Sequence, residues 1–87
     1  MPKFHFYADP GHGWVKVPFK LLKELNIEKD ISTFSYVYGI NVYLEEDGDL
    51  AKFLKAMKKA GKVVEFIEHH TDKTSKIRGY GMYENKL

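Results

Sequence analysis

The stretch Lys3–Pro18, KFHFYADPGHGWVKVP, decides the fold of this chain. Its two ends, residues 3–8 and 14–17, alternate along the chain with the period of a half-buried strand. One side carries Phe4, Phe6, Ala8, Val15 and Val17, and the other carries His5, Tyr7, Trp14 and Lys16. Because only a short loop separates the two ends, the stretch predicts a β-hairpin with one apolar face and one face of aromatic and polar residues.

The loop inside this stretch, Asp-Pro-Gly-His-Gly at 9–13, has the composition of a β-turn. Proline suits the second position of such a turn and glycine suits the third, where φ is positive. Asp9 is able to accept hydrogen bonds from the backbone ahead of it, and Gly13 adds freedom before the next strand. We therefore interpret the loop first as a tight bend.

The residues after the hairpin predict two helices and three strands. The helices follow Pro18 and Asp47, where apolar residues recur at helical spacing, and they end at Asn26 and Gly61. The strands are residues 31–38, 41–46 and 62–70, the first two joined by a tight reversal at 39–40. The resulting order, β-β-α-β-β-α-β, predicts a single small α+β domain with a mainly antiparallel sheet.

The length of 87 residues suits one domain with a core of modest size. We assign residues 1–71 to an α+β core and residues 72–87, which are rich in small, polar and basic residues, to a surface tail of the same domain. The chain contains no cysteine, which excludes a disulfide framework and a thiolate nucleophile. Neither a signal-peptide pattern nor an apolar run of about 20 residues occurs, so we expect a cytoplasmic protein without a membrane partner.

The loop also suggests one enzyme class, a metal-dependent hydrolase. DPGHG resembles the first zinc-ligand segment of cell-wall amidases, and that resemblance implies His12 as a ligand. A catalytic zinc needs three protein ligands, and the adjacent His69 and His70 face opposite sides of a strand. No nucleophile elbow, phosphate-binding loop or dinucleotide motif occurs either. We therefore predict no catalytic residues, no metal and no cofactor, and keep the hydrolase as a third hypothesis.

The excess of aromatic residues beside cations predicts a binding surface instead. A domain of this size has limited core volume, and exposed aromatic patches usually mark recognition sites. Tyrosine, tryptophan and arginine are common anchors in protein interfaces, and cations interleaved with aromatics also suit phosphates and unstacked bases. The predicted binding residues are His12, Trp14, Lys16, Tyr36, Lys76, Arg78 and Tyr80.

Residues 13–44, GWVKVPFKLLKELNIEKDISTFSYVYGINVYL, resemble the AbrB-type swapped-hairpin family. The residues that fit its pattern are Gly13, Val15, Val17, Pro18, Leu21, Leu25 and Ile27. This resemblance implies a dimeric DNA-binding transcriptional regulator. Trp14 and Leu22 stand where that family often has arginine, the residue that would hold phosphates. The regulator is our second hypothesis.

A second resemblance covers nearly the whole chain. The segments DPGHGW, SY, YLEED and HHTDKTSKIR resemble small accessory proteins carried by bacteriophages, prophages and plasmids. That resemblance implies a bacterial host cytoplasm and action by binding, including inhibition of a host defence complex. Our first hypothesis is accordingly a non-catalytic protein that occupies a host protein or a protein–nucleic acid complex, with nucleic acid as a further candidate partner.

Overall fold

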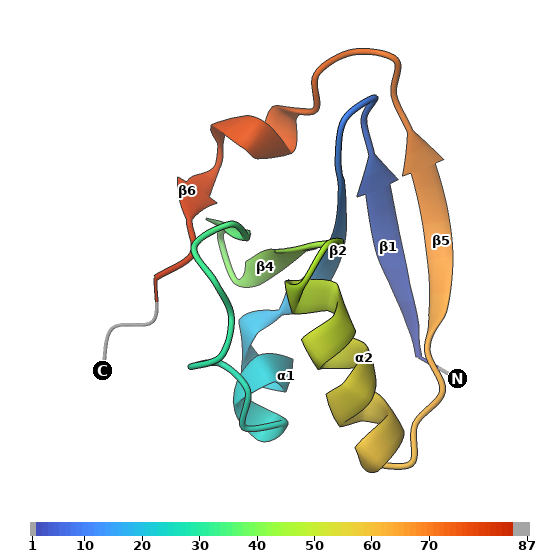
Figure 1. Ribbon diagram of the computed structural model, residues 1–87, viewed down its shortest axis with the longest axis vertical. Helices are drawn as coiled ribbons and strands as arrows, with labels where there is room; N and C mark the ends of the chain where they lie inside the picture. Colours follow the sequence, from blue (N-terminus) through green and yellow to red (C-terminus); the bar gives the residue numbers. More distant parts are fainter. Residues whose placement is uncertain (1, 85–87) are drawn as a thin grey trace.

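The hairpin forms as predicted in the computed structural model, which describes residues 2–84 (Figure 1). Strand β1 (Lys3–Ala8) pairs antiparallel with β2 (Gly13–Pro18), and Tyr7 lies opposite Trp14 in the ladder. The Asp9 N–H donates to the carbonyl of His12 at 2.9 Å and closes the loop. The alternation read from the sequence therefore places the two sets of side chains on opposite faces of the sheet.

Four further strands extend the hairpin to a six-stranded sheet in the order β5-β1-β2-β4-β3-β6. They are β3 (Tyr36–Tyr38), β4 (Asn41–Glu45), β5 (Glu65–His70) and β6 (Gly81–Met82). Strand β5 runs parallel to β1, whereas every other neighbouring pair is antiparallel. The α+β class and the mainly antiparallel sheet are confirmed, and β6 is an addition to the predicted order.

The two helices, α1 (Phe19–Glu24) and α2 (Asp49–Lys59), end where the sequence predicts. Asn26 has φ 58° and Gly61 has φ 76°, and the residue after each donates its N–H back into the last helical turn. This combination of a positive φ and a hydrogen bond back into the helix is the Schellman motif. It satisfies carbonyls that a helix end would otherwise leave unpaired. Neither helix, nor any other within residues 2–84, has the length and apolarity to cross a membrane.

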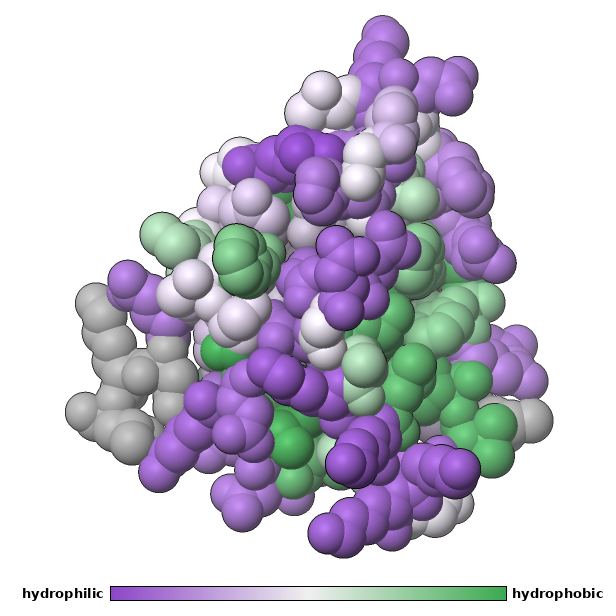
Figure 2. All heavy atoms as spheres, in the orientation of Figure 1, coloured by the Kyte–Doolittle hydropathy of each residue, from purple (hydrophilic) through white to green (hydrophobic). Residues whose placement is uncertain are grey.

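The main core lies between one face of the sheet and the helices. Its fully buried members include Val15, Val17, Leu22, Val42, Leu44, Phe53, Met57 and Tyr83. The ring of Phe4 meets that of Phe53 edge-on at 5.2 Å, which joins β1 to α2. On the face shown in Figure 2, apolar atoms gather beside α2 over β1 and β5, where Phe66 is partly exposed. The helices thus cover the middle of the sheet more completely than its β5 edge.

The opposite face of the sheet has a smaller core of Trp14, Tyr43 and Ile77. Ile77 comes from a short 3₁₀ helix, η1 (Lys76–Gly79), which follows β5 and crosses this face. Trp14 is only 2% exposed and Tyr43 only 7%. The expectation that Trp14 offers an accessible ring is therefore wrong, because the chain beyond residue 71 returns to cover it.

The strand predicted at 62–70 begins only at Glu65, and two other predicted segments differ more from the structure. Residues 31–35 form no strand, because Ser32 and Ser35 turn toward the carboxylate of Asp49 at the start of α2. The described part of the expected surface tail, residues 72–84, is mostly exposed but buries Ile77 and Tyr83. The tail therefore lies at the surface and also contributes side chains to the core. Its residues 85–87 lie outside the described residues.

Candidate functional site

The loop at 9–13 is organised by one buried carboxylate, that of Asp9. Its Oδ1 accepts the N–H groups of Gly11 at 3.0 Å and His12 at 2.9 Å, as expected for a turn of this composition. Its Oδ2 accepts the N–H of Ser75 at 3.0 Å, from the segment that follows β5. A single side chain therefore shapes the loop and fastens the C-terminal segment to it.

Arg78 forms a bidentate ion pair with the same carboxylate. Its Nε lies 2.6 Å from Oδ2 of Asp9 and its Nη2 lies 2.9 Å from Oδ1. The guanidinium, and next the N–H of Ser75, hold the pKa of Asp9 well below its usual range, and Asp9 in turn raises the pKa of Arg78. The charge of Arg78 is therefore already compensated inside the molecule.

The Arg78 guanidinium also fixes His12 and Trp14. It lies 5.5 Å from the centre of the Trp14 ring, within the range of a cation–π contact, and its Nη2 lies 2.8 Å from Nδ1 of His12. Because arginine has no acceptor, Nδ1 of His12 accepts this bond and the imidazole proton sits on Nε2. The sequence motifs DPGHGW and SKIR thus form one interlocked unit.

The structure does not support the positive φ that was predicted to explain the glycine in the turn. Gly11 has no positive φ, so that prediction is wrong. A Cβ at Gly11 would lie 3.1 Å from Nη2 of Arg78, and a Cβ at Gly13 would lie 2.7 Å from the ring of Phe6. At both positions a neighbouring side chain lies so close to the backbone that a Cβ would require it to shift.

The arrangement around His12 does not supply the ligands that a hydrolytic metal needs. Its Nδ1 is engaged by Arg78, and the facing ring nitrogens of His5 and His69, 2.8 Å apart, lie on β1 and β5. Within residues 2–84 no group of three histidine, cysteine, aspartate or glutamate side chains is placed to hold a metal ion. The hydrogen bonds that Asp9 accepts from Gly11 and His12 shape the loop as a bend.

A groove of about 840 Å³ opens next to this unit, and we call it the aromatic groove. Five of the seven predicted binding residues line it, namely His12, Trp14, Tyr36, Arg78 and Tyr80. Phe34 and Met82, which are 76% and 58% exposed, stand at its border. In Figure 1 the bordering elements are η1 above, β6 at the left and the first turn of α2 below.

The wall of the groove near α2 is built around the buried carboxylate of Asp49. It accepts the hydroxyls of Ser35 at 2.6 Å and Ser32 at 2.7 Å, and Lys52 lies 3.2 Å away. Burial raises the pKa of Asp49, but the hydrogen bonds from Ser35, Ser32 and Lys52 outweigh it and leave the pKa below its ordinary value. This network fixes residues 32–35 against α2.

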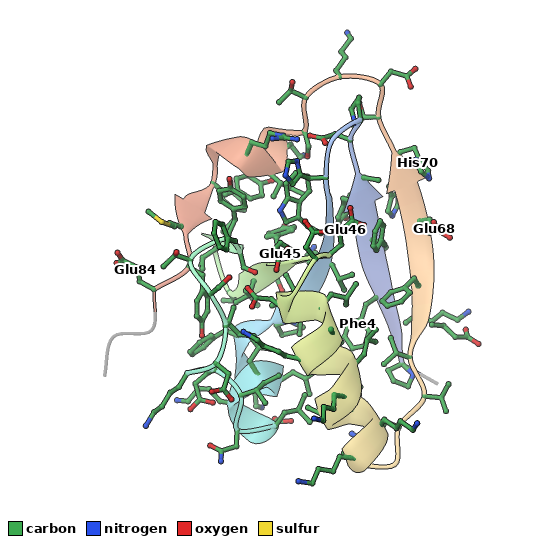
Figure 3. The ribbon with its side chains drawn as sticks, in the orientation of Figure 1. Phe4, Glu45, Glu46, Glu68, His70 and Glu84 are labelled. Atoms are coloured by element: carbon green, nitrogen blue, oxygen red, sulfur yellow. The ribbon has the colours of Figure 1, made fainter. Side chains whose placement is uncertain are left out.

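Two more acidic residues give that wall its charge. The carboxylate of Glu45 accepts the N–H groups of Asp47 at 2.7 Å and Asp49 at 2.8 Å, so it caps the start of α2. Glu45 and its neighbour Glu46 lie close together beside the first turn of α2 (Figure 3). The side chain of Asp47 is exposed and has no partner within the described residues. The wall is therefore acidic, because the nearby cations Lys52 and Arg78 are both paired.

A second hollow of about 450 Å³ adjoins the groove on the other side of Tyr80. We call it the tyrosine–lysine hollow and define it by Tyr7, Lys16, Tyr38, Tyr43, Lys76 and Tyr80. The rings of Tyr38 and Tyr80 stack at 4.5 Å. Burial, together with the neighbouring phenols of Tyr80 and Tyr7, raises the pKa of Tyr43 to about 12. Lys16 and Lys76, the two remaining predicted residues, both line this hollow.

The seven predicted residues thus gather around two adjacent hollows, but they differ in access. Trp14 forms a buried floor, Arg78 is ion-paired, and the exposed apolar border is made by residues outside the predicted set. Those residues are Phe34, Tyr38, Ile40 and Met82. Ile40 carried a signal in the sequence, because an isoleucine beside glycine at the tip of a tight reversal points to solvent. Met82 carried none, since β6 itself was not foreseen.

Comparisons with known proteins find no relative for this fold and site. No protein family matches the chain, no curated protein matches it, and no solved structure matches it.

Proposed function

We propose that the protein is a non-catalytic binding protein of a phage or other mobile element, and that it occupies a host protein through the aromatic groove. One observation carries the proposal. Of the seven large apolar side chains exposed within residues 2–84, four border two adjoining hollows: Phe34 and Met82 line the aromatic groove, and Tyr38 and Ile40 line the hollow beside it. Clustered apolar exposure of this kind is costly in water and usually marks a recognition surface.

The chemistry of the groove favours a protein partner. Its wall carries the acidic residues Glu45 and Asp47, and the charge of Arg78 is compensated by Asp9. A phosphate backbone would meet these carboxylates unfavourably, whereas a protein surface with an apolar anchor and a basic rim would complement them. Buried Trp14 supports the groove from below, so the surface is shaped before the partner arrives.

The biological setting rests on the resemblance to phage, prophage and plasmid proteins. In that setting the host is a bacterium, the place is its cytoplasm, and a host defence complex is the kind of target that such a binder inhibits. A protein–nucleic acid complex fits the same description. Binding alone is sufficient for this role, so no reacting residue is needed.

The test is capture of the partner from bacterial lysate with matched variants. The tagged protein is cross-linked to its partner, which is identified by mass spectrometry, and the affinity is then measured with both proteins purified. Phe34→Ala should weaken binding at least tenfold, because truncating an exposed aromatic anchor removes a hot spot. Val63→Ala, an apolar residue of similar exposure near the β5 edge, should leave the affinity within about twofold.

The remaining hypotheses predict other outcomes. A dimeric DNA-binding regulator predicts a dimer in light scattering together with a mobility shift of duplex DNA that weakens steeply with salt. A metal hydrolase predicts turnover of a substrate that His12→Ala abolishes. Either result, or a captured partner that Phe34→Ala leaves fully bound, contradicts the proposal.

A further inference from the structure

We propose that the tyrosine–lysine hollow binds a nucleotide of single-stranded nucleic acid, with a base on its tyrosine rings and a phosphate between Lys16 and Lys76. This site is separate from the aromatic groove and goes beyond the function proposed above. The two surfaces meet at Tyr80, which lines both. A partner that is itself a complex of protein and nucleic acid would be able to contact both at once.

Charge is the first support for this assignment. Lys16 is half-buried and Lys76 exposed, and neither has an ion-pair partner within residues 2–84. Among residues 2–84, no carboxylate lines the hollow. By contrast, Lys52 and Arg78, which line the neighbouring groove, are paired with Asp49 and Asp9. Two uncompensated cations at a hollow of neutral phenols complement an anionic ligand.

The aromatic surface is the second support. Tyr38 is 62% exposed although one side of its ring stacks on Tyr80 at 4.5 Å, so its exposure belongs to the remaining side and edge. Tyr80 in turn packs on buried Tyr43 at 5.1 Å. The rings are therefore held in place by one another, and a base that stacks on Tyr38 orders few new torsions. Exposed Ile40 adds apolar contact at the border.

Size and hydrogen bonding favour a single strand. A hollow of about 450 Å³ lies within the range of sites for small ligands, so it is large enough for one nucleotide. Bases in a duplex are stacked on their neighbours, and only an unpaired base is able to offer its face to a tyrosine. Every base has such a face, so we expect weak sequence preference. Because Lys16 and Lys76 would contact a phosphate, we also expect the affinity to depend strongly on salt.

The experiment measures fluorescence anisotropy of labelled oligothymidylate about eight nucleotides long, within the site sizes known for single-strand binders. We expect the double variant Lys16→Ala/Lys76→Ala to weaken binding at least tenfold and to reduce the salt dependence by one to two ion equivalents. Tyr38→Ala should weaken binding about fivefold or more through the loss of stacking. The charge-matched control Lys55→Ala/Lys59→Ala, on exposed positions of α2, should change the affinity less than about twofold.

Four results would overturn the assignment. These are no binding of the single strand at low salt, equal weakening by the α2 control, tighter binding of a duplex of the same length, and equal binding of an acidic peptide such as oligoglutamate. Circular dichroism verifies that each variant is folded before it is measured. Capture of the protein partner is scored separately with Phe34→Ala, so that failure of this site and failure of the aromatic groove are distinguishable.

Discussion

Asp9 shows how much of this molecule depends on a single side chain. Its buried carboxylate accepts bonds from the backbone of its own loop, from Ser75 and from the Arg78 guanidinium. A turn-forming aspartate was predictable from the Asp-Pro-Gly order, because that bond is local. The partnership with Arg78 was not, because the two residues are 69 positions apart and nothing in the local pattern pairs them.

Asp9→Asn should lower stability and flatten its dependence on acidic pH. The pKa of Asp9 is depressed in the folded state, so its contribution is complete above the unfolded value of 3.8 and is lost as pH falls toward the folded value. Thermal unfolding followed by circular dichroism should show a lower midpoint at pH 7 and a weaker decline between about pH 5 and pH 2. Some decline of stability at acidic pH remains in this variant, because the pKa of Asp49 is also lowered in the folded state.

The exposed Asp72→Asn is the control for that measurement, because its carboxylate has no partner within the described residues. This variant should leave the midpoint of thermal unfolding at pH 7, and its decline at acidic pH, close to those of the unmodified protein. An Asp9→Asn profile that runs parallel to the unmodified one over the same pH range would show that the carboxylate does not carry this stability.

At the scale of elements, strands and helix ends were predictable where their cause is local. Strand β1 and the stops at Asn26 and Gly61 follow from alternation and from left-handed conformers. Residues 31–35 were not predictable, although their alternation is typical of a strand. Asp49 draws Ser32 and Ser35 into a hydrogen-bonded loop, and this contact between distant residues overrides the local preference.

The left-handed end of α1 predicts opposite effects for two substitutions at Asn26. Asn26→Ala should lower the free energy of unfolding by about 1 kcal/mol, because alanine tolerates positive φ poorly. Asn26→Gly should leave it unchanged or raise it by a few tenths of a kcal/mol, since glycine is the usual residue there. Urea unfolding measures both. An alanine variant as stable as the glycine variant would contradict the positive φ of 58°.

For the whole molecule, the C-terminal segment matters more than its composition suggested. It sends Tyr83 into the main core, where the phenol donates to the carbonyl of Glu28, and Ile77 against Trp14 and Tyr43 on the opposite face. Both faces of the sheet are thereby covered, and residues of this segment, among them Arg78 and Tyr80, line the two hollows. Each candidate site therefore combines residues of the hairpin with residues of the C-terminal segment.

Ile77→Ala should lower the free energy of unfolding by about 2–4 kcal/mol, because it leaves a cavity in the small core. Trp14 rests against that core, so its fluorescence should shift to longer wavelength as water gains access. Met82→Ala removes an exposed side chain from the same segment and should change stability by less than about 0.5 kcal/mol. Unchanged Trp14 emission in the Ile77 variant would contradict the cover that Ile77 provides.

By itself, the amino-acid sequence determined the α+β class, the two faces of the hairpin and the helix ends. These features follow from side-chain period and backbone preference, which act over a few residues. The tertiary structure alone decided that Trp14 is buried, that Arg78 is paired with Asp9, that β5 joins β1 in parallel, and which aromatic rings reach solvent. Those outcomes depend on contacts between segments that are distant in the sequence, and the local periodicity of side chains does not specify such contacts.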